Sequence, residues 1–211
     1  MLEPDVTVTD LVLAAQCTAY SVLLSRNGDE EPLVRRLYAM LFAALGVASL
    51  FGGLWHGVFS ERETVLGQWV WLCVMAALAV AAALLWYISA ALFCSAKWAP
   101  IVRMIALVYL LFQISVSAFV TDSFAIATVG LLPPVITMIA GNASRFRRTR
   151  SRRALYGAAG FSLAVLAGLI IAFDVSLHPR LATALAVYHM VQFVAFWMIF
   201  WSVPGGASHP R

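Results

Sequence analysis

The chain has 211 residues, of which 63% are hydrophobic and 11% are charged, and its formal net charge is +4. Soluble domains carry about 25% charged residues, so this composition excludes an ordinary water-soluble domain and indicates a chain that uses lipid as its solvent. The positive charge does not indicate nucleic-acid binding, because six of the 13 arginines lie in one short stretch, RFRRTRSRR, beside an apolar segment. Such a cluster is typical of the cytoplasmic side of a membrane protein.

Seven apolar segments are long enough to cross a membrane, which takes about 20 residues each. We therefore expect an all-α membrane protein, a seven-transmembrane-helix bundle that forms a single domain over residues 1–211. In chain order the expected helices cover residues 8–25, 33–59, 66–94, 99–121, 123–141, 153–174 and 181–203. The opening MLEPDVTVTD is acidic where a signal peptide is positive, so the first segment is expected to remain as a helix. Pro133 and Pro134 predict a kink or break in the fifth helix.

The basic residues predict the orientation of the bundle in the membrane. Eleven of them fall on the side of the first, third and fifth connections, and two fall on the opposite side. The eleven are Arg26, Arg35, Arg36, Lys97, Arg103, Arg145, Arg147, Arg148, Arg150, Arg152 and Arg153, and the two are Arg62 and Arg180. The positive-inside rule then places the N-terminus outside and the C-terminus in the cytoplasm. We expect a multi-pass protein of the plasma (inner) membrane.

In that orientation the polar residues of the apolar segments gather toward the outer side. His56 lies at the outer end of the second helix, and His189 lies about 12 Å inside the last one at about 1.5 Å per residue. Ionisable groups within a membrane usually face the bundle interior and pair, so we expect the two imidazoles to approach each other. Separately hydrogen-bonded histidines are the alternative. Further candidates on the same side are Asp10, Gln113, Asp122, Asp174, His178 and Gln192, although an aspartate at a helix end is also a common cap.

Two neutral imidazoles and one carboxylate are a reasonable ligand set for zinc, with a fourth position left for water. Asp10 is the most suitable carboxylate, because it lies one turn inside the first helix. It could serve as a metal ligand, as a group that orients a ligand, or as a general base.

This pattern resembles the CREST superfamily, the seven-helix membrane hydrolases that include the alkaline ceramidases and the adiponectin-receptor group. The resemblance rests on the helix count, the chain length, and the positions of His56 in GLWHG and His189 in VYHMVQF. It implies a zinc-dependent hydrolase that acts on an amide or ester bond of a membrane lipid at the outer leaflet.

The sequence departs from the family pattern at three places. The serine that precedes the first histidine by four residues is replaced by Gly52, with Ser49 the nearest serine. The aspartate of the third helix is missing. The second histidine of the last helix is also missing, so His178 or Gln192 would have to replace it.

Other classes of protein fit the same residues. A non-catalytic membrane protein (a ligand binder, a carrier or a partner subunit) would use the buried histidines structurally. Two histidines from different helices could also ligate a b-type haem. A retinal protein is excluded, because the one lysine, Lys97, lies at the end of the third helix.

Overall fold

The computed structural model describes residues 3–26, 31–59 and 64–204, and these residues form seven α-helices and no β-strand. All seven are long and apolar enough to cross a membrane, as the helices of a multi-pass membrane protein are. The helices are α1 (Pro4–Arg26), α2 (Pro32–Val58), α3 (Val65–Phe93), α4 (Ala99–Phe119), α5 (Phe124–Thr149), α6 (Arg152–Ala172) and α7 (Ala184–Ser202). The predicted number and order of helices are confirmed.

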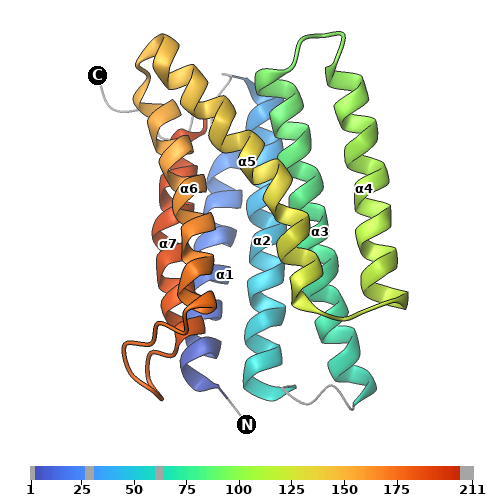
Figure 1. Cartoon of the computed structure of the whole chain (residues 1–211), viewed down its shortest axis with the longest axis vertical. Coiled ribbons are helices and arrows are strands. Elements are labelled where there is room, and N and C mark those ends of the chain that lie inside the picture. Colours follow the sequence, from blue (N-terminus) through green and yellow to red (C-terminus); the bar gives the residue numbers. More distant parts are fainter. Residues whose placement is uncertain (1–2, 27–30, 60–63, 205–211) are drawn as a thin grey trace.

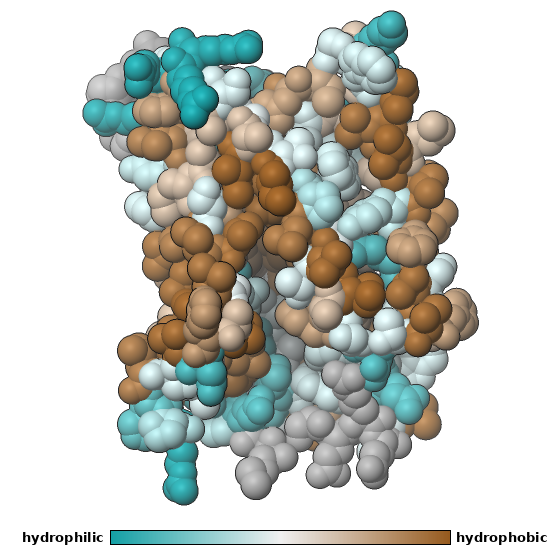
Figure 2. Space-filling model, viewed as in Figure 1, coloured by the Kyte–Doolittle hydropathy of each residue, from teal (hydrophilic) through white to brown (hydrophobic). Residues whose placement is uncertain are grey.

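Successive helices run in alternating directions, so the bundle has two distinct ends (Figure 1). We call the end where α1 and α7 begin the N-terminal end. The opposite end, where α5 finishes and α6 begins, contains the six arginines of residues 145–153 and is called the arginine end. Hydrophobic residues cover the middle of the face in Figure 2, and hydrophilic residues collect toward the two ends. This distribution is the one that a bilayer requires.

Six of the helices form a closed ring in the order α1, α2, α3, α5, α6, α7, since α7 packs against α1. The fourth helix lies outside the ring, mainly against α3 (Figure 1). In the most apolar stretch of α4, 11% of the residues are buried, against 56% for α3. The site at the N-terminal end is therefore built by α1, α2 and α7, and α4 takes no part in it.

The fifth helix continues through two features that the sequence suggested would interrupt or end it, the proline pair and the arginine stretch. The arginine stretch was expected to be a connection, but α5 continues through it to Thr149 and ends at Arg150, which has a left-handed backbone (φ 54°). Arginine is a good helix former, and Arg147 and Arg148 in the last turn suit the negative end of the helix dipole.

Of the expected kink or break at the proline pair, the break is absent, because α5 is one helix with Pro133 and Pro134 inside it. Proline has no N–H to donate, so the carbonyl of Gly130, four residues before Pro134, loses its helical partner. The hydroxyl of Tyr109 on α4 donates to this carbonyl at 2.8 Å. A neighbouring helix thus supplies the missing hydrogen bond, which is how membrane helices tolerate proline.

The half of the bundle nearest the arginine end is filled with apolar and aromatic side chains. Tyr20 of α1 stacks on Phe200 of α7 with ring centroids 4.2 Å apart, and it meets Phe42 of α2 edge-on at 5.2 Å. Phe42 is fully buried. This packing separates the polar groups at the N-terminal end from the arginine end.

Candidate functional site

Asp10 is a carboxyl group placed between helices at the N-terminal end of the bundle. It lies in α1 and is only 5% exposed. Two glycines of α2 make room for it: a Cβ atom at Gly52 would lie 3.0 Å from Asp10 Oδ2, and one at Gly53 would lie 3.4 Å from Asp10 Cβ. The glycines of FGGLWHG therefore allow α1 and α2 to approach closely enough to enclose the carboxyl group.

The imidazole of His189 on α7 is the partner of this carboxyl group. His189 is 9% exposed, its Nε2 lies 3.6 Å from Asp10 Oδ1, and its Nδ1 lies 3.1 Å from the hydroxyl of Thr9. That hydroxyl donates to main-chain carbonyls one turn earlier, at 2.9 Å and 3.0 Å. Since its single hydrogen is used there, Thr9 accepts from Nδ1–H, and Nε2 faces Asp10.

Asp10 and His189 form a buried acid–base contact, whose 3.6 Å separation is longer than a direct hydrogen bond. A neutral ring with its hydrogen on Nδ1 has a bare Nε2, so the pair attracts only if the carboxyl group or the ring carries an additional proton. A buried carboxylate without a proton or a cation beside it would be costly. The pair is thus suited to proton transfer or to holding a cation.

His56 is held by the beginning of the chain. Its Nδ1 lies 2.5 Å from Glu3 Oε2, and the main-chain N–H of Glu3 donates to the carbonyl of His56 at 3.2 Å. Because the carboxylate accepts, Nδ1 carries the hydrogen here too, and Nε2 is the nitrogen left for another partner. The hydrogen-bonding partners of His56 and His189 are Glu3, which precedes α1, and Thr9 of α1. Each ring is thus held by a partner of its own, and the expected approach of the two rings to each other stays a prediction.

The start of α7 is also fastened to α1. Asp5 Oδ2 accepts hydrogen bonds from the main-chain N–H of Thr183 at 3.0 Å and from its hydroxyl at 2.7 Å. Thr183 is the residue that precedes the first turn of α7. This contact holds α7 in the position that brings His189 to Asp10.

Three of the other predicted residues lie within helices but away from the pair. Gln192 donates from Nε2 to the carbonyl of Ala164 on α6 at 3.1 Å. Gln113 lies on the outlying α4 and donates to the carbonyl of Ile126 on α5 at 3.3 Å. Ser49 is half-buried in α2, seven residues before His56.

The remaining three predicted residues lie in connections between helices. The main-chain carbonyl of Asp122 accepts from Trp71 Nε1 at 2.7 Å. Asp174 follows α6 with a left-handed backbone (φ 49°) and is exposed. His178 is exposed, and its Nδ1 accepts from the N–H groups of the two residues after Pro179, at 3.2 Å and 3.1 Å. That ring therefore organises its own loop.

Sequence reasoning missed three residues at the start of the chain that hold the histidines and α7. Glu3, Asp5 and Thr9 stand in the acidic opening LEPDVTVTD, which indicated only the absence of a signal peptide. The available signal was the four-residue spacing of Asp5 and Thr9, which places them on one face of a helix. Which helix that face contacts could not be read from spacing.

Two buried amides extend the polar line along α1 and α7. Gln16 donates from Nε2 to the carbonyl of Phe193 at 2.8 Å and to the hydroxyl of Tyr20 at 3.1 Å. The Oε1 atoms of Gln16 and Gln192 are buried and have no hydrogen-bond partner in the described part of the chain. Orphaned buried oxygens of this kind are usually satisfied by water.

Among the described residues, no three or more His, Cys, Asp or Glu side chains are grouped so that they could hold a metal ion together. Two donors are suitably placed. Zinc–nitrogen and zinc–oxygen bonds of about 2.1 Å put two ligands of a tetrahedron about 3.4 Å apart, close to the 3.6 Å between His189 Nε2 and Asp10 Oδ1. The Nδ1 contacts with Thr9 and Glu3 are of the kind that orient metal-binding histidines. Asp10 and His189 therefore supply two of the three protein ligands that a catalytic zinc site uses.

Comparison with known proteins gives a family but no activity. No curated protein and no solved structure shows significant similarity to the chain. One family model, described as a family of unknown function, DUF6962, matches residues 6–208 and therefore spans α1 to α7 almost completely. The chain belongs to this family, DUF6962.

Proposed function

We propose that this protein is a membrane-embedded hydrolase that cleaves an amide or ester bond of a lipid, with Asp10 and His189 as its reacting pair. The observation that carries the proposal is the buried carboxyl–imidazole contact at 3.6 Å, with the opposite ring nitrogen fixed by Thr9. A carboxyl group and an imidazole in contact can remove a proton from water and deliver it to a leaving group.

The depth of the pair supports a lipid substrate. Asp10 is six residues from the start of α1, and His189 is five residues from the start of α7. At about 1.5 Å per residue, both lie roughly 8–9 Å inside the helix ends. The interfacial layer on each side of the hydrocarbon core is about 5–8 Å thick. The pair thus lies near the level at which ester and amide linkages join headgroups to acyl chains.

In the proposed reaction Asp10 accepts a proton from a water molecule, whose oxygen bonds to the carbonyl carbon of the lipid. His189 then supplies a proton to the amine or alcohol that leaves when the C–N or C–O bond breaks. Thr9 holds the ring through Nδ1, so that Nε2 keeps facing the reacting groups. Glu3 orients His56 toward the same end of the bundle.

Zinc is the cofactor proposed for this centre. Asp10 and His189 would hold it, and His56 Nε2 is the third donor that the sequence suggests. Bound zinc would lower the pKa of a water molecule toward neutrality and so make a nucleophile. The described contacts of His56 are with Glu3 and do not include Asp10 or His189, and for that reason the steps above are assigned to the side chains alone.

A non-catalytic role is the second candidate, and one observation favours it. The space beside the carboxyl group is so small that a Cβ atom at Gly52 would lie 3.0 Å from Asp10 Oδ2, and Asp10 is only 5% exposed. In this case the pair would hold α1 to α7 and would bind a proton or a small cation, without admitting a lipid carbonyl group.

The test measures zinc and hydrolysis in the same detergent-purified samples. We expect roughly one zinc per chain by elemental analysis and turnover of fluorogenic lipid amides or esters. Asp10→Asn and His189→Gln should abolish turnover while the protein stays folded. His178→Ala is the matched control, since that exposed ring belongs to a loop, and it should keep wild-type activity.

Each outcome separates the two candidates. Turnover without metal that still requires Asp10 and His189 supports the hydrolase and removes zinc from it. A folded wild-type protein that cleaves neither amides nor esters overturns the hydrolase and leaves the non-catalytic role.

A further inference from the structure

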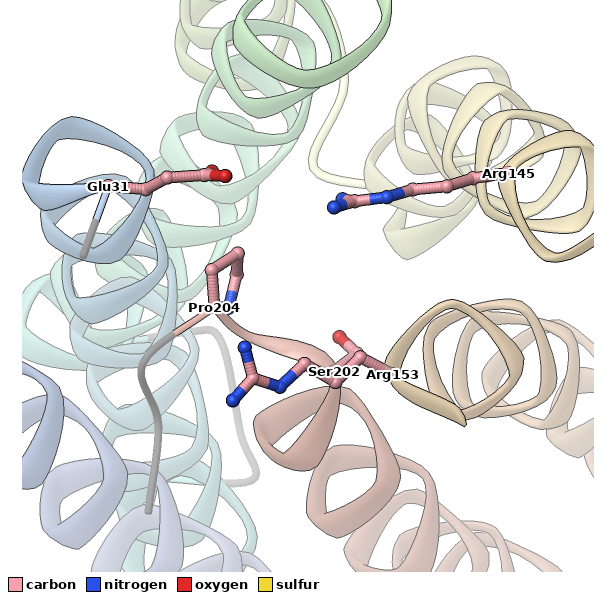
Figure 3. A pocket seen from close by; sticks show the side chains of 5 residues that line it. All are labelled: Glu31, Arg145, Arg153, Ser202 and Pro204. Carbon is pink, nitrogen blue, oxygen red and sulfur yellow. The ribbon is translucent and has the colours of Figure 1, made fainter. Parts of the chain in front are cut away.

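A pocket of about 260 Å³ opens at the arginine end, far from the Asp10–His189 pair (Figure 3). It is lined by Glu31, Arg145, Arg153, Ser202 and Pro204. These residues come from the start of α2, the last part of α5, the first turn of α6 and the end of α7. Four helices that are distant in sequence therefore meet around one polar cavity at the edge of the membrane-spanning region.

The electrostatics of this cavity favour an anion. Among the described residues that line it, two carry guanidinium groups and one carries a carboxylate. The first turn of α6 contains Arg152 and Arg153 and no acidic residue, and the preceding Ser151 makes no capping hydrogen bond with its side chain. Positive charges at a helix N-terminus are unfavourable, because the helix dipole is already positive there. A phosphate group would be attracted both by the guanidinium groups and by this helix N-terminus.

The carboxylate occupies a different side of the cavity from the arginine of α5. In Figure 3, Glu31 and Arg145 extend toward each other from α2 and α5 across the open space. They form no ion pair with each other in the described part of the chain. The cavity therefore presents positive and negative groups on opposite walls, and a ligand that carries both signs of charge complements it.

The size and surroundings of the cavity match a lipid headgroup rather than a whole lipid. At about 260 Å³ it is just below the roughly 300–1,000 Å³ of pockets that enclose a drug-sized molecule. Directly beyond Arg153 on α6, Leu155 and Tyr156 are exposed at 47% and 36%. Acyl chains attached to a headgroup in the cavity would find apolar surface along this helix.

We propose that this pocket binds a phospholipid headgroup that carries both a phosphate and a primary ammonium group, as phosphoethanolamine does. Arg145 and Arg153 bind the phosphate, and Glu31 binds the ammonium group. The surrounding arginines draw phosphates toward this end of the bundle, and the carboxylate makes the pocket selective for a headgroup with an amine.

The experiment is native mass spectrometry of the full chain, released from detergent with equal amounts of phosphatidylethanolamine, phosphatidylglycerol and phosphatidylcholine. Phosphatidylethanolamine should be retained preferentially. Arg145→Gln should weaken its retention roughly tenfold, since a hydrogen bond to a charged group is lost. Glu31→Gln should keep phospholipid binding but lose the preference for the amine. Arg148→Gln is the matched control, since it removes the same charge from the same helix outside the pocket.

Two results would overturn the proposal. One is equal or stronger retention of phosphatidylglycerol or phosphatidylcholine by the wild-type chain. The other is retention that Arg145→Gln and Arg148→Gln weaken equally, because binding would then follow total charge. A parallel titration with inorganic phosphate distinguishes the source: if phosphate alone displaces the lipid at low millimolar concentration, the pocket is a free-phosphate site and the lipid assignment fails. None of these results depends on hydrolase activity.

Discussion

Gly52→Ala and Gly53→Ala form a matched pair of substitutions that tests the packing around Asp10. Either alanine should gain about 0.5–1 kcal/mol from helix propensity. At Gly53 the new methyl group meets its neighbours at 3.4 Å, which is ordinary contact. At Gly52 it meets Asp10 Oδ2 at 3.0 Å and Oδ1 at 3.3 Å, so the carboxyl group must move by a few tenths of an ångström. Overpacking of this kind costs about 1–3 kcal/mol.

The expected result is a difference of about 1–3 kcal/mol in the free energy of unfolding, in favour of Gly53→Ala. In a chain of this size about 1 kcal/mol corresponds to roughly 2–4 °C in Tm. Thermal unfolding in detergent, followed by tryptophan fluorescence, measures the difference, and Gly52→Ala should also impair any function of the pair. Equal Tm values for the two variants, or a lower one for Gly53→Ala, would refute the close approach of α2 to Asp10.

Three further predictions concern other parts of the bundle. Tyr109→Phe removes the donor to the carbonyl of Gly130 and should lower the free energy of unfolding by about 1 kcal/mol, as measured by thermal unfolding; an unchanged Tm would contradict this role. Arg35→Ala should cost about 2–4 kcal/mol, because the side chain is 6% exposed and donates at 3.0 Å and 3.1 Å to a carbonyl at the end of α1. Single cysteines placed at Arg148 and Arg180 should react with impermeant reagents from opposite sides of the membrane, and labelling of both from one side would rule out the seven-span topology.

The sequence predicted the helices well because their signal is local. Runs of about 20 apolar residues gave all seven segments in order, and their ends agree to within about four residues except in α5. There the arginines were interpreted as a connection, although nothing in residues 142–149 breaks a helix. The prolines predicted a kink or a break, and the helix continues through them because the hydroxyl of Tyr109 on another helix supplies a hydrogen bond that the sequence does not reveal. Both differences arise where local composition is an incomplete guide to helix ends and contacts.

The candidate site was harder to predict, since it depends on which helix faces meet. Asp10 and His189 were both selected from their positions in apolar segments, and the structure brings them together. Hydropathy could not tell that His56 would contact Glu3, because hydropathy does not specify hydrogen-bond partners. Four other candidates lie toward the same end of the bundle but are not brought to the pair, namely Gln113, Asp122, Asp174 and His178. Membrane depth alone does not show which residues face one another.

The position of α4 outside the ring has a consequence for how the protein opens. Its attachment depends on one side of α3 and on two polar side chains, Tyr109 and Gln113, that reach the backbone of α5. Local stability follows the amount of packed surface, so this span should be the first to detach when detergent or heat loosens the molecule. The carbonyl of Gly130 would then be exposed beside the proline pair, and α5 would bend there. Detachment would leave α1, α2 and α7 joined, so the contact between Asp10 and His189 would persist after α4 has separated.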